Sequence, residues 1–365
     1  MNNVVYLILS IVLSFLITFA LTPHVICLAF KKQWFDAVDA RKIHHGLIPR
    51  VGGMVFVPSA LISCIASLAA AVLLENQCLD ECQVSLISFG CIFVSLLMIY
   101  AEGIVDDIKG VGYKVKFFVH FLCALLVVAS GVWINNFYGL FGLYEIPWVF
   151  GVPFSILLIM FVINAVNLID GIDGLCSGLT MVAFLFLATL FYLQDNMAEA
   201  CLSLSMFGAL ASYHCFNVFG RVEKHSKIFM GDCGSQVLGL LLGVLAVRYA
   251  MYQADNDHSS GTLIVAFSLM IIPCLDVIRV MLGRIRRGAN PFLPDKTHIH
   301  HLLLAKGWTQ RKTRLFIIAV AILFVVLNLV LDARVNVNIV FAIDIALYLL
   351  LQQWIVRTKN KVERL

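Results

Sequence analysis

The segment 161–175 (FVINAVNLIDGIDGL) combines an apolar run with four polar side chains at intervals of three residues. These side chains are Asn164, Asn167, Asp170 and Asp173. In a helix, each step of three drifts only about 60° around the axis, so the first three form one polar stripe. Within a membrane such a stripe is tolerated only against protein or a water-filled cavity. Hydrogen bonds between helices would explain the two Asn, but the two Asp-Gly steps favour an edge that faces a nucleotide or a sugar.

Two further acidic motifs follow apolar or glycine-rich sequence. Asp106 and Asp107 are adjacent, and Asp232 lies in GDCGS. Adjacent carboxylates repel each other, and a proton or a divalent cation relieves the repulsion. Mg²⁺ is commonly held by a few carboxylates together with substrate phosphate oxygens, and a glycine-rich turn presents backbone N–H groups to phosphate. A solvated helix end would explain the acidic pair, and a helix N-cap would explain the turn, without any ligand.

The sequence HIHH places His298, His300 and His301 in a segment rich in Lys and Arg. A zinc site is one interpretation, but no Cys accompanies the cluster and the spacing is not typical of zinc. Cations near a phosphate are the simpler account, and imidazole can stabilise charge on a leaving phosphate. Asp276 and Arg279, three residues apart, are expected to form a structural ion pair.

The composition predicts a membrane protein that crosses the bilayer many times. Of the 365 residues, 61% are hydrophobic and 13% charged, whereas soluble domains have about 45–50% apolar and about 25% charged residues. Long apolar runs with little alternation favour helices over a β-barrel. We expect one all-α polytopic helix bundle over residues 1–365, with about eleven transmembrane helices. The expected spans are 4–30, 51–74, 84–104, 115–134, 147–168, 176–193, 199–219, 235–251, 261–282, 315–332 and 337–356.

Lys and Arg residues predict the orientation of these spans. All of them except Arg248, Arg279 and Arg334 fall in alternate loops and the C-terminal tail, which the positive-inside rule assigns to the cytoplasm. The N-terminus is then outside, the C-terminus is cytoplasmic, and the acidic motifs lie together at the cytoplasmic face. The net charge of +4 reflects this topology and gives no reason to expect nucleic acid as a partner. Cys78 and Cys82 share an outer loop, and a disulfide and two free thiols are both left open.

Acidic motifs, imidazoles and cations on one face predict Mg²⁺-assisted chemistry on a phosphorylated substrate. A site at the mouth of a helix bundle can take a polar donor from the cytoplasm and a lipid acceptor from the bilayer. An ion-coupled transporter is the alternative outside enzymes, but it predicts acids at mid-span and internal symmetry. A membrane scaffold would scatter its polar groups. We therefore expect a membrane-embedded phosphotransferase.

The motifs VDD, NAVNLIDGIDGL, FMGDCGS and PFLPDKTHIHH resemble those of the polyprenyl-phosphate N-acetylhexosamine-1-phosphate transferases. The resemblance runs from about residue 39 to residue 307 and is strongest to the bacterial enzymes that act on undecaprenyl phosphate and UDP-GlcNAc. It implies transfer of N-acetylglucosamine-1-phosphate to the lipid, with release of UMP, in the bacterial inner membrane. It also implies Mg²⁺, with Mn²⁺ as an alternative ion, and a role in priming cell-envelope polysaccharide. UDP-GalNAc and UDP-MurNAc-pentapeptide stay open as donors, as do the polymer and a homodimer.

The resemblance also implies roles for individual residues. Asp232, with Asp107, would bind the metal, and Asp106 and Asp107 would be catalytic, leaving open which of the pair acts as base. His298, His300 and His301 would act near the sugar and diphosphate, and Lys116 would hold the lipid phosphate. The residues expected to bind the nucleoside end of the substrate are Asn164, Asn167, Asp170, Asp173 and Asn217. Two positions depart from the family pattern: Glu102 stands where an apolar residue is expected, and Cys233 where Ala, Val or Thr is usual.

Overall fold

The computed structural model describes residues 2–35, 47–75, 86–254, 262–290, 297–332 and 334–362. In these residues the regular structure is helical, and the only β pairing consists of two isolated bridges. The predicted all-α class is therefore confirmed for the part of the chain that the structure describes. Cys78 and Cys82 lie outside it, as do residues 39–46 at the start of the resemblance to the family.

The helices follow the apolar runs of the sequence closely. Their bounds are α1 (Asn2–Lys32), α2 (Gly53–Glu75), α3 (Leu86–Lys109), α4 (Tyr113–Ala129), a 3-10 turn η2 (Leu140–Gly142), α5 (Trp148–Ile169), α6 (Leu175–Leu193), α7 (Met197–Phe219), α8 (Asp232–Ala254), α9 (Thr262–Ser268), α10 (Ile271–Arg286), α11 (Ile299–Leu304), α12 (Gln310–Asp332) and α13 (Val337–Val362).

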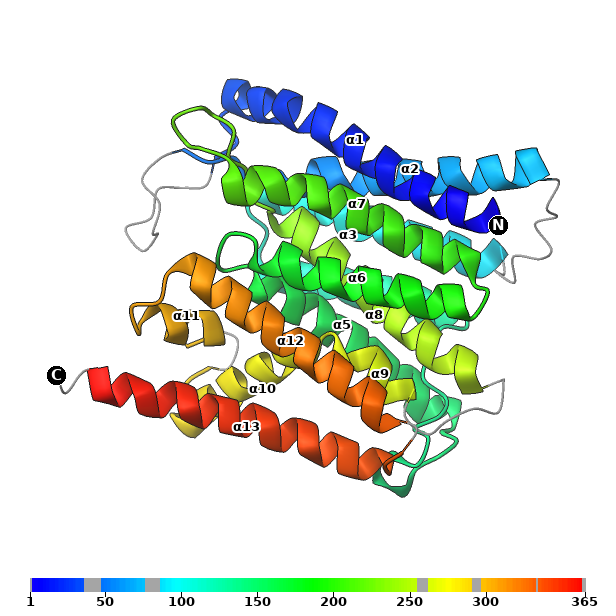
Figure 1. Cartoon of the computed structure of the whole chain (residues 1–365), viewed down its shortest axis with the longest axis vertical. Helices are drawn as coiled ribbons and strands as arrows, with labels where there is room; N and C mark the ends of the chain where they lie inside the picture. The colour runs from blue at the N-terminus through cyan, green and yellow to red at the C-terminus, as the bar shows by residue number, and fades with distance from the viewer. Residues whose placement is uncertain are drawn as a thin grey trace.

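Eight of the described helices are long and apolar enough to cross a membrane, namely α1, α2, α3, α5, α6, α8, α12 and α13. The chain is therefore a multi-pass membrane protein. The shorter α4 and the less apolar α7 pack among them, α4 against α3 and α5, and α7 against α1 and α6. The N-terminal end of α1 and the C-terminal end of α13 lie at opposite ends of the bundle, as an odd number of spans requires (Figure 1). The count of eleven and the direction of insertion stay predictions.

The expected span 261–282 is divided into two helices, α9 and α10. The break lies just before Pro273, which occupies the first turn of α10. Proline has no N–H to donate to the carbonyl four residues earlier, and its ring clashes with that carbonyl, so the first turn of a helix accepts proline more readily than the interior does. Helix α10 can therefore leave the line of α9 and approach the segment that carries the histidines.

Helix α8 forms the centre of the bundle and is almost entirely buried. It packs against α2, α3, α5, α6 and α9, with α1, α2 and α7 toward one edge of the molecule and α10, α12 and α13 toward the other (Figure 1). At its N-terminal end the neighbouring helices come within backbone contact. A Cβ on Gly53 of α2 would lie 2.3 Å from the backbone nitrogen of Gly234, and one on Gly103 of α3 would lie 2.3 Å from the Cα of Cys233. These close contacts fix the position of α3 relative to α8, and with it the positions of the acidic residues at the ends of the two helices.

Candidate active site

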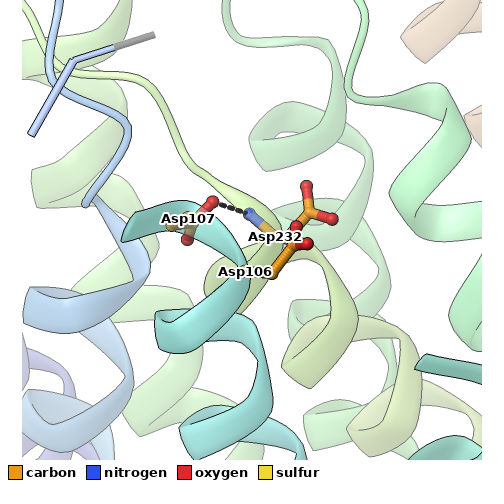
Figure 2. Close-up of side chains that lie close together, drawn as sticks. All are labelled: Asp106, Asp107 and Asp232. Atoms are coloured by element: carbon orange, nitrogen blue, oxygen red, sulfur yellow. Dashed lines mark hydrogen bonds between the residues drawn. The ribbon is translucent and has the colours of Figure 1, made fainter. Parts of the chain in front are cut away.

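Three carboxylates from two helices meet at the N-terminal end of α8. Asp106 and Asp107 lie in the last turn of α3, and Asp232 is the first residue of α8 (Figure 2). Each offers an oxygen atom, and these oxygens all lie within 4.8 Å of one another. Positions separated by 125 residues in the chain therefore form one cluster, as the sequence motifs predict. We call these three residues the acidic cluster.

Asp107 holds the start of α8. Its Oδ1 accepts the backbone N–H of Asp232 at 2.7 Å, and its Oδ2 accepts that of Cys233 at 3.0 Å (Figure 2). A carboxylate here satisfies helix N–H groups that have no partner within the helix and lies at the positive end of the helix dipole. Gly231, just before the helix, has φ +77°, and a Cβ there would lie 2.4 Å from Asp107 Oδ2. The backbone conformation and the limited space around position 231 therefore both require a glycine there.

Lys116 joins the other two carboxylates. Its Nζ lies 2.6 Å from Asp106 Oδ2 and 2.5 Å from Asp232 Oδ2, so one ammonium group offsets two negative charges. Two residues that sequence analysis did not select also reach Asp232. Arg50 Nη2 lies 3.6 Å from its Oδ1, and Gln236 Nε2 donates to its Oδ2 at 3.4 Å. Gln236 lies one helical turn after Asp232, which is a signal that the sequence does carry.

A cavity of about 170 Å³ lies between α4, α5, α8 and α10 and has both polar and apolar side chains in its lining; Lys116 and Gln236, which contact the acidic cluster, are among them. Asn164 and Asn167 both line it, so the polar stripe of α5 faces a cavity rather than lipid. Asn167 is held in place because its Nδ2 donates to Ser235 Oγ at 2.9 Å. Other polar residues in the lining are Lys116, His120, Gln236, Arg284 and His298. These amide, imidazole and cationic side chains can bind a ligand that carries hydroxyl, amide and phosphate groups.

Asp170 follows the last residue of α5, and the pKa of its carboxyl depends on the charges of the other acidic residues. Burial raises its pKa to about 7; the nearby Arg50 opposes this shift, and the carboxylates of Asp232, Asp173 and Asp107 add to it. Like charges influence a pKa only over short distances. The DGIDG turn is therefore close enough to the acidic cluster for the charges of Asp107 and Asp232 to act on Asp170.

Asp173 and Asn217 form hydrogen bonds that hold this turn in place. Asp173 Oδ2 accepts from Lys227 Nζ at 2.5 Å, and its backbone carbonyl accepts from Arg314. Asn217 accepts the N–H of Gly174 at 2.7 Å and donates to the carbonyl of Ile228 at 2.9 Å. Both side chains thus tie the turn to the segment that precedes α8. Their contact with a nucleoside stays a prediction.

The histidine motif packs directly on the DGIDG turn. His300 is buried, and a Cβ on Gly171 would lie 2.1 Å from its Nε2. Neither ring nitrogen of His300 has a hydrogen-bond partner among the described residues, and burial, with the neighbouring His301, lowers its pKa to about 3. The ring therefore stays neutral at physiological pH. The rings of His300 and His301 lie 4.1 Å apart, and His298 lines the cavity.

The acidic cluster suits a hard divalent cation, since Mg²⁺ prefers carboxylate oxygens. Among the residues that the structure describes, it is the only group of three His, Cys, Asp or Glu side chains close enough to share an ion. Within that part of the chain, the three histidines do not form such a group. The zinc interpretation of HIHH therefore has no support in the geometry.

The two departures from the family pattern have different structural settings. Cys233 is fully buried and touches Gly103 and Gly53, so the position requires a small side chain and Cys meets that requirement. Glu102 lies one helical turn from Asp106 and is buried, and in the part of the chain that the structure describes neither of its carboxylate oxygens has a hydrogen-bond partner. Nothing in the structure explains why a Glu stands there.

Comparison with known proteins agrees with this geometry. Residues 89–250 match the family described as glycosyl transferase family 4. The undecaprenyl-phosphate alpha-N-acetylglucosaminyl 1-phosphate transferase of Yersinia pestis is 31% identical over 83% of this chain and 78% of its own length. The Escherichia coli (strain K12) protein of that name is 29% identical over 79% and 74%. The probable undecaprenyl-phosphate N-acetylglucosaminyl 1-phosphate transferase of Bacillus subtilis (strain 168) is 27% identical over 91% and 87%. The chain therefore belongs to glycosyl transferase family 4, among the sugar 1-phosphate transferases that act on undecaprenyl phosphate.

Proposed function

We propose that this protein transfers N-acetylglucosamine-1-phosphate from UDP-GlcNAc to undecaprenyl phosphate. The single observation that carries the proposal is the acidic cluster, in which Lys116 bridges Asp106 and Asp232 and also lines a cavity between helices of the bundle. The names of the relatives supply the two substrates. A site of this kind at the edge of a bundle can receive a water-soluble nucleotide sugar and a lipid phosphate together.

The proposed reaction exchanges one phosphoanhydride bond for another. An oxygen of the lipid phosphate forms a bond to the β-phosphorus of UDP-GlcNAc, and the bond from that phosphorus to the oxygen bridging the two phosphates breaks. UMP leaves with the bridging oxygen, and the lipid keeps the sugar pyrophosphate. A phosphate monoester has a second pKa of about 6, so the attacking oxygen is already largely ionised near neutral pH. The protein therefore has to position and neutralise the phosphates more than to remove a proton.

Cationic side chains carry part of that task. Lys116 lies between Asp106 and Asp232 and also lines the cavity, so its ammonium group is placed to meet the lipid phosphate at the boundary of the two. Arg50 lies on the other side of Asp232. Asp106, Asp107 and Asp232 would hold Mg²⁺, or Mn²⁺ in its place. When bound, that ion would neutralise charge on the diphosphate and on the departing UMP.

The remaining site residues are assigned to the nucleotide sugar. Asn164 and Asn167 line the cavity and can hydrogen-bond to it, and Asp170 stands at the end of the same helix. His298 faces the same space, while His300 supports the DGIDG turn through Gly171. A neutral His300 cannot supply a positive charge to phosphate, so its proposed role is to shape the site. We place the site at the cytoplasmic face of a bacterial inner membrane because the basic loops lie on that side.

The test uses purified full-length protein with radiolabelled UDP-GlcNAc, undecaprenyl phosphate and Mg²⁺, followed by lipid extraction. We expect label in the lipid phase and equimolar UMP, with little product from UDP-GalNAc. The Yersinia pestis relative serves as a positive control. The Asp232→Asn variant should lose nearly all transfer while still inserting and folding. Label transfer by that variant at the wild-type rate in limiting Mg²⁺ would refute the metal assignment, and no transfer by the wild type would refute the function.

A further inference from the structure

Asp276 of α10 is one of the most deeply buried carboxylates in the described chain, with 1% of its surface exposed. Its Oδ2 lies 2.9 Å from His298 Nδ1, and its Oδ1 lies 2.7 Å from Arg279 Nη2. The backbone N–H of Ile299 donates to both oxygens, at 3.1 and 3.2 Å, and the hydroxyl of Tyr348 approaches Oδ1 at 3.3 Å. One carboxylate thus joins α10, α13 and the start of the histidine motif.

The predicted ion pair of Asp276 with Arg279 is present, but it is only part of the arrangement. Arg279 Nη2 also donates to the backbone carbonyl of Thr297, the residue just before His298. The guanidinium offsets the buried negative charge and at the same time fixes the chain that leads into the motif. Asp276 and Arg279 together hold both the backbone and the side chain of His298.

This contact determines which nitrogen of His298 is free. An ionised carboxylate only accepts hydrogen bonds, so Nδ1 carries the proton and donates it to Asp276. The other ring nitrogen is Nε2, on a ring that lines the same cavity as Lys116 and Asn167. In the neutral ring Nε2 is an acceptor. Its natural partners in a nucleotide sugar are hydroxyl and amide N–H groups, because phosphate oxygens of an ionised diphosphate offer no proton.

We propose that Asp276 is a positioning residue that holds His298 with Nε2 toward the cavity, where it accepts a hydrogen bond from the sugar of the donor substrate. This proposal rests on the proposed function. It identifies the sugar, rather than the uridine or the phosphates, as the part of the substrate that Asp276 influences. His298 is the residue that touches substrate, and Asp276 acts through it.

The experiment measures binding of UDP-GlcNAc and of UMP, with transfer as a separate readout, for wild type, Asp276→Asn, His298→Ala and the double variant. Asn would turn an amide N–H toward Nδ1 and so favour the wrong tautomer. Partners that orient a metal-binding histidine are commonly worth about 10- to 100-fold, and we expect a loss of UDP-GlcNAc binding of that order for each single variant. UMP, which lacks the N-acetylglucosamine and the β-phosphate, should bind within about twofold of wild type.

The double variant tests whether Asp276 acts through His298. If it does, Asp276→Asn adds little once His298 is absent, since residues that work as one unit are not additive. Losses that multiply in the double variant, or UMP binding that weakens as much as UDP-GlcNAc binding, would overturn the proposal. Because binding is measured separately from transfer, an inactive wild type would refute the function while the binding data still decide the role of Asp276.

Two further variants guard against a general effect on folding. His298→Asn keeps a side-chain N–H near the place of Nδ1, so Asp276 stays paired, but it removes Nε2. We expect the same loss of UDP-GlcNAc binding, and wild-type affinity would overturn the proposal even if Asp276→Asn failed to fold.

Asp344→Asn is the matched control, because Asp344 of α13 is equally buried. It accepts a hydrogen bond from Asn328 of α12 at 3.0 Å, and neither residue lines the cavity. This variant should leave UDP-GlcNAc binding unchanged, and a loss equal to that of Asp276→Asn would count against the proposal.

Discussion

Asp107 and Asp232 are joined through the backbone: a carboxylate oxygen of Asp107 accepts the N–H of Asp232 at 2.7 Å. The side chain of Asp107 is therefore both a helix cap and a member of the acidic cluster. The position of the Asp232 carboxylate depends on it, because the cap fixes where α8 begins. The two acids form one structural unit, although they come from different helices.

Replacement of Asp107 should therefore damage both stability and activity. Asp107→Asn keeps one acceptor oxygen but turns an amide toward the other helix N–H, and loss of a cap costs about 0.5–2 kcal/mol. We expect a lower thermal midpoint in detergent and nearly complete loss of sugar-phosphate transfer. Asp195→Asn is a matched control, since Asp195 is exposed at the far end of α6 with φ +57°, a conformation that Asn tolerates. Wild-type turnover in Asp107→Asn would contradict the role given to the carboxylate.

Gly231→Ala tests the space around the cap. The new Cβ would lie 2.4 Å from Asp107 Oδ2 on a residue with φ +77°. We expect the carboxylate to move, with at least a tenfold loss of transfer and a clear loss of stability. Gly131→Ala controls for the backbone, because Gly131 also has positive φ but has nothing within 4 Å of the added atom. That control should cost only the strain of a left-handed conformation, about 1–2 kcal/mol, and should keep its activity once folded.

Gly171→Ala tests the contact between the DGIDG turn and the histidine motif. Its Cβ would lie 2.1 Å from His300 Nε2, and because the His300 ring is buried, either the ring or the turn has to shift. We expect a loss of transfer of about tenfold or more with a modest change in thermal midpoint. Gly90→Ala, within α3 and with open space around the added atom, should be silent or slightly stabilising. Equal activity of the two variants would show that this contact does not matter for the reaction.

The raised pKa of Asp170 predicts a pH dependence of stability. The folded protein holds a proton on Asp170 up to about pH 7, whereas the unfolded chain releases it near pH 4. Between these values the folded state binds more protons, so the contribution of Asp170 to stability falls as pH rises from about 4 to about 7 and is constant above. Asp170→Asn removes that slope. Its thermal midpoint relative to wild type, measured without substrate, should rise from pH 5 to pH 8, and a difference independent of pH would contradict the assignment.

Most of the fold could be predicted because apolar length is a strong signal. A run such as that of α5 leaves little choice other than a helix within the membrane. The division of the span 261–282 into α9 and α10 has a visible cause in Pro273, but proline also occurs inside α1, α2 and α5. The sequence alone does not show which proline ends a helix, because that depends on which carbonyls find other partners.

The site was predictable where residue type and spacing carry the chemistry. Asp106, Asp107 and Asp232 meet as their motifs indicate, and Asn164 and Asn167 face a common cavity. The contacts of Asp276 with His298 were not predictable, since the nearer Arg279 accounts for a buried carboxylate on a helix face. Whether the carboxylate also contacts His298 depends on how segments far apart in the sequence come together, and no local pattern specifies that.

The glycine contacts of α2 and α3 with α8 limit how the molecule can move. With Gly53 against Gly234 and Gly103 against Cys233, sliding these helices past one another would drive main chain into main chain. This side of the site is therefore a fixed wall. The opposite side is formed by α10 and by residues 297–304, which are held by side-chain hydrogen bonds and ring contacts that can exchange partners. If one side of the site yields when a bulky nucleotide enters, it is that opposite side, so we expect turnover to be more sensitive to crosslinks placed there than to any placed between α2 and α8.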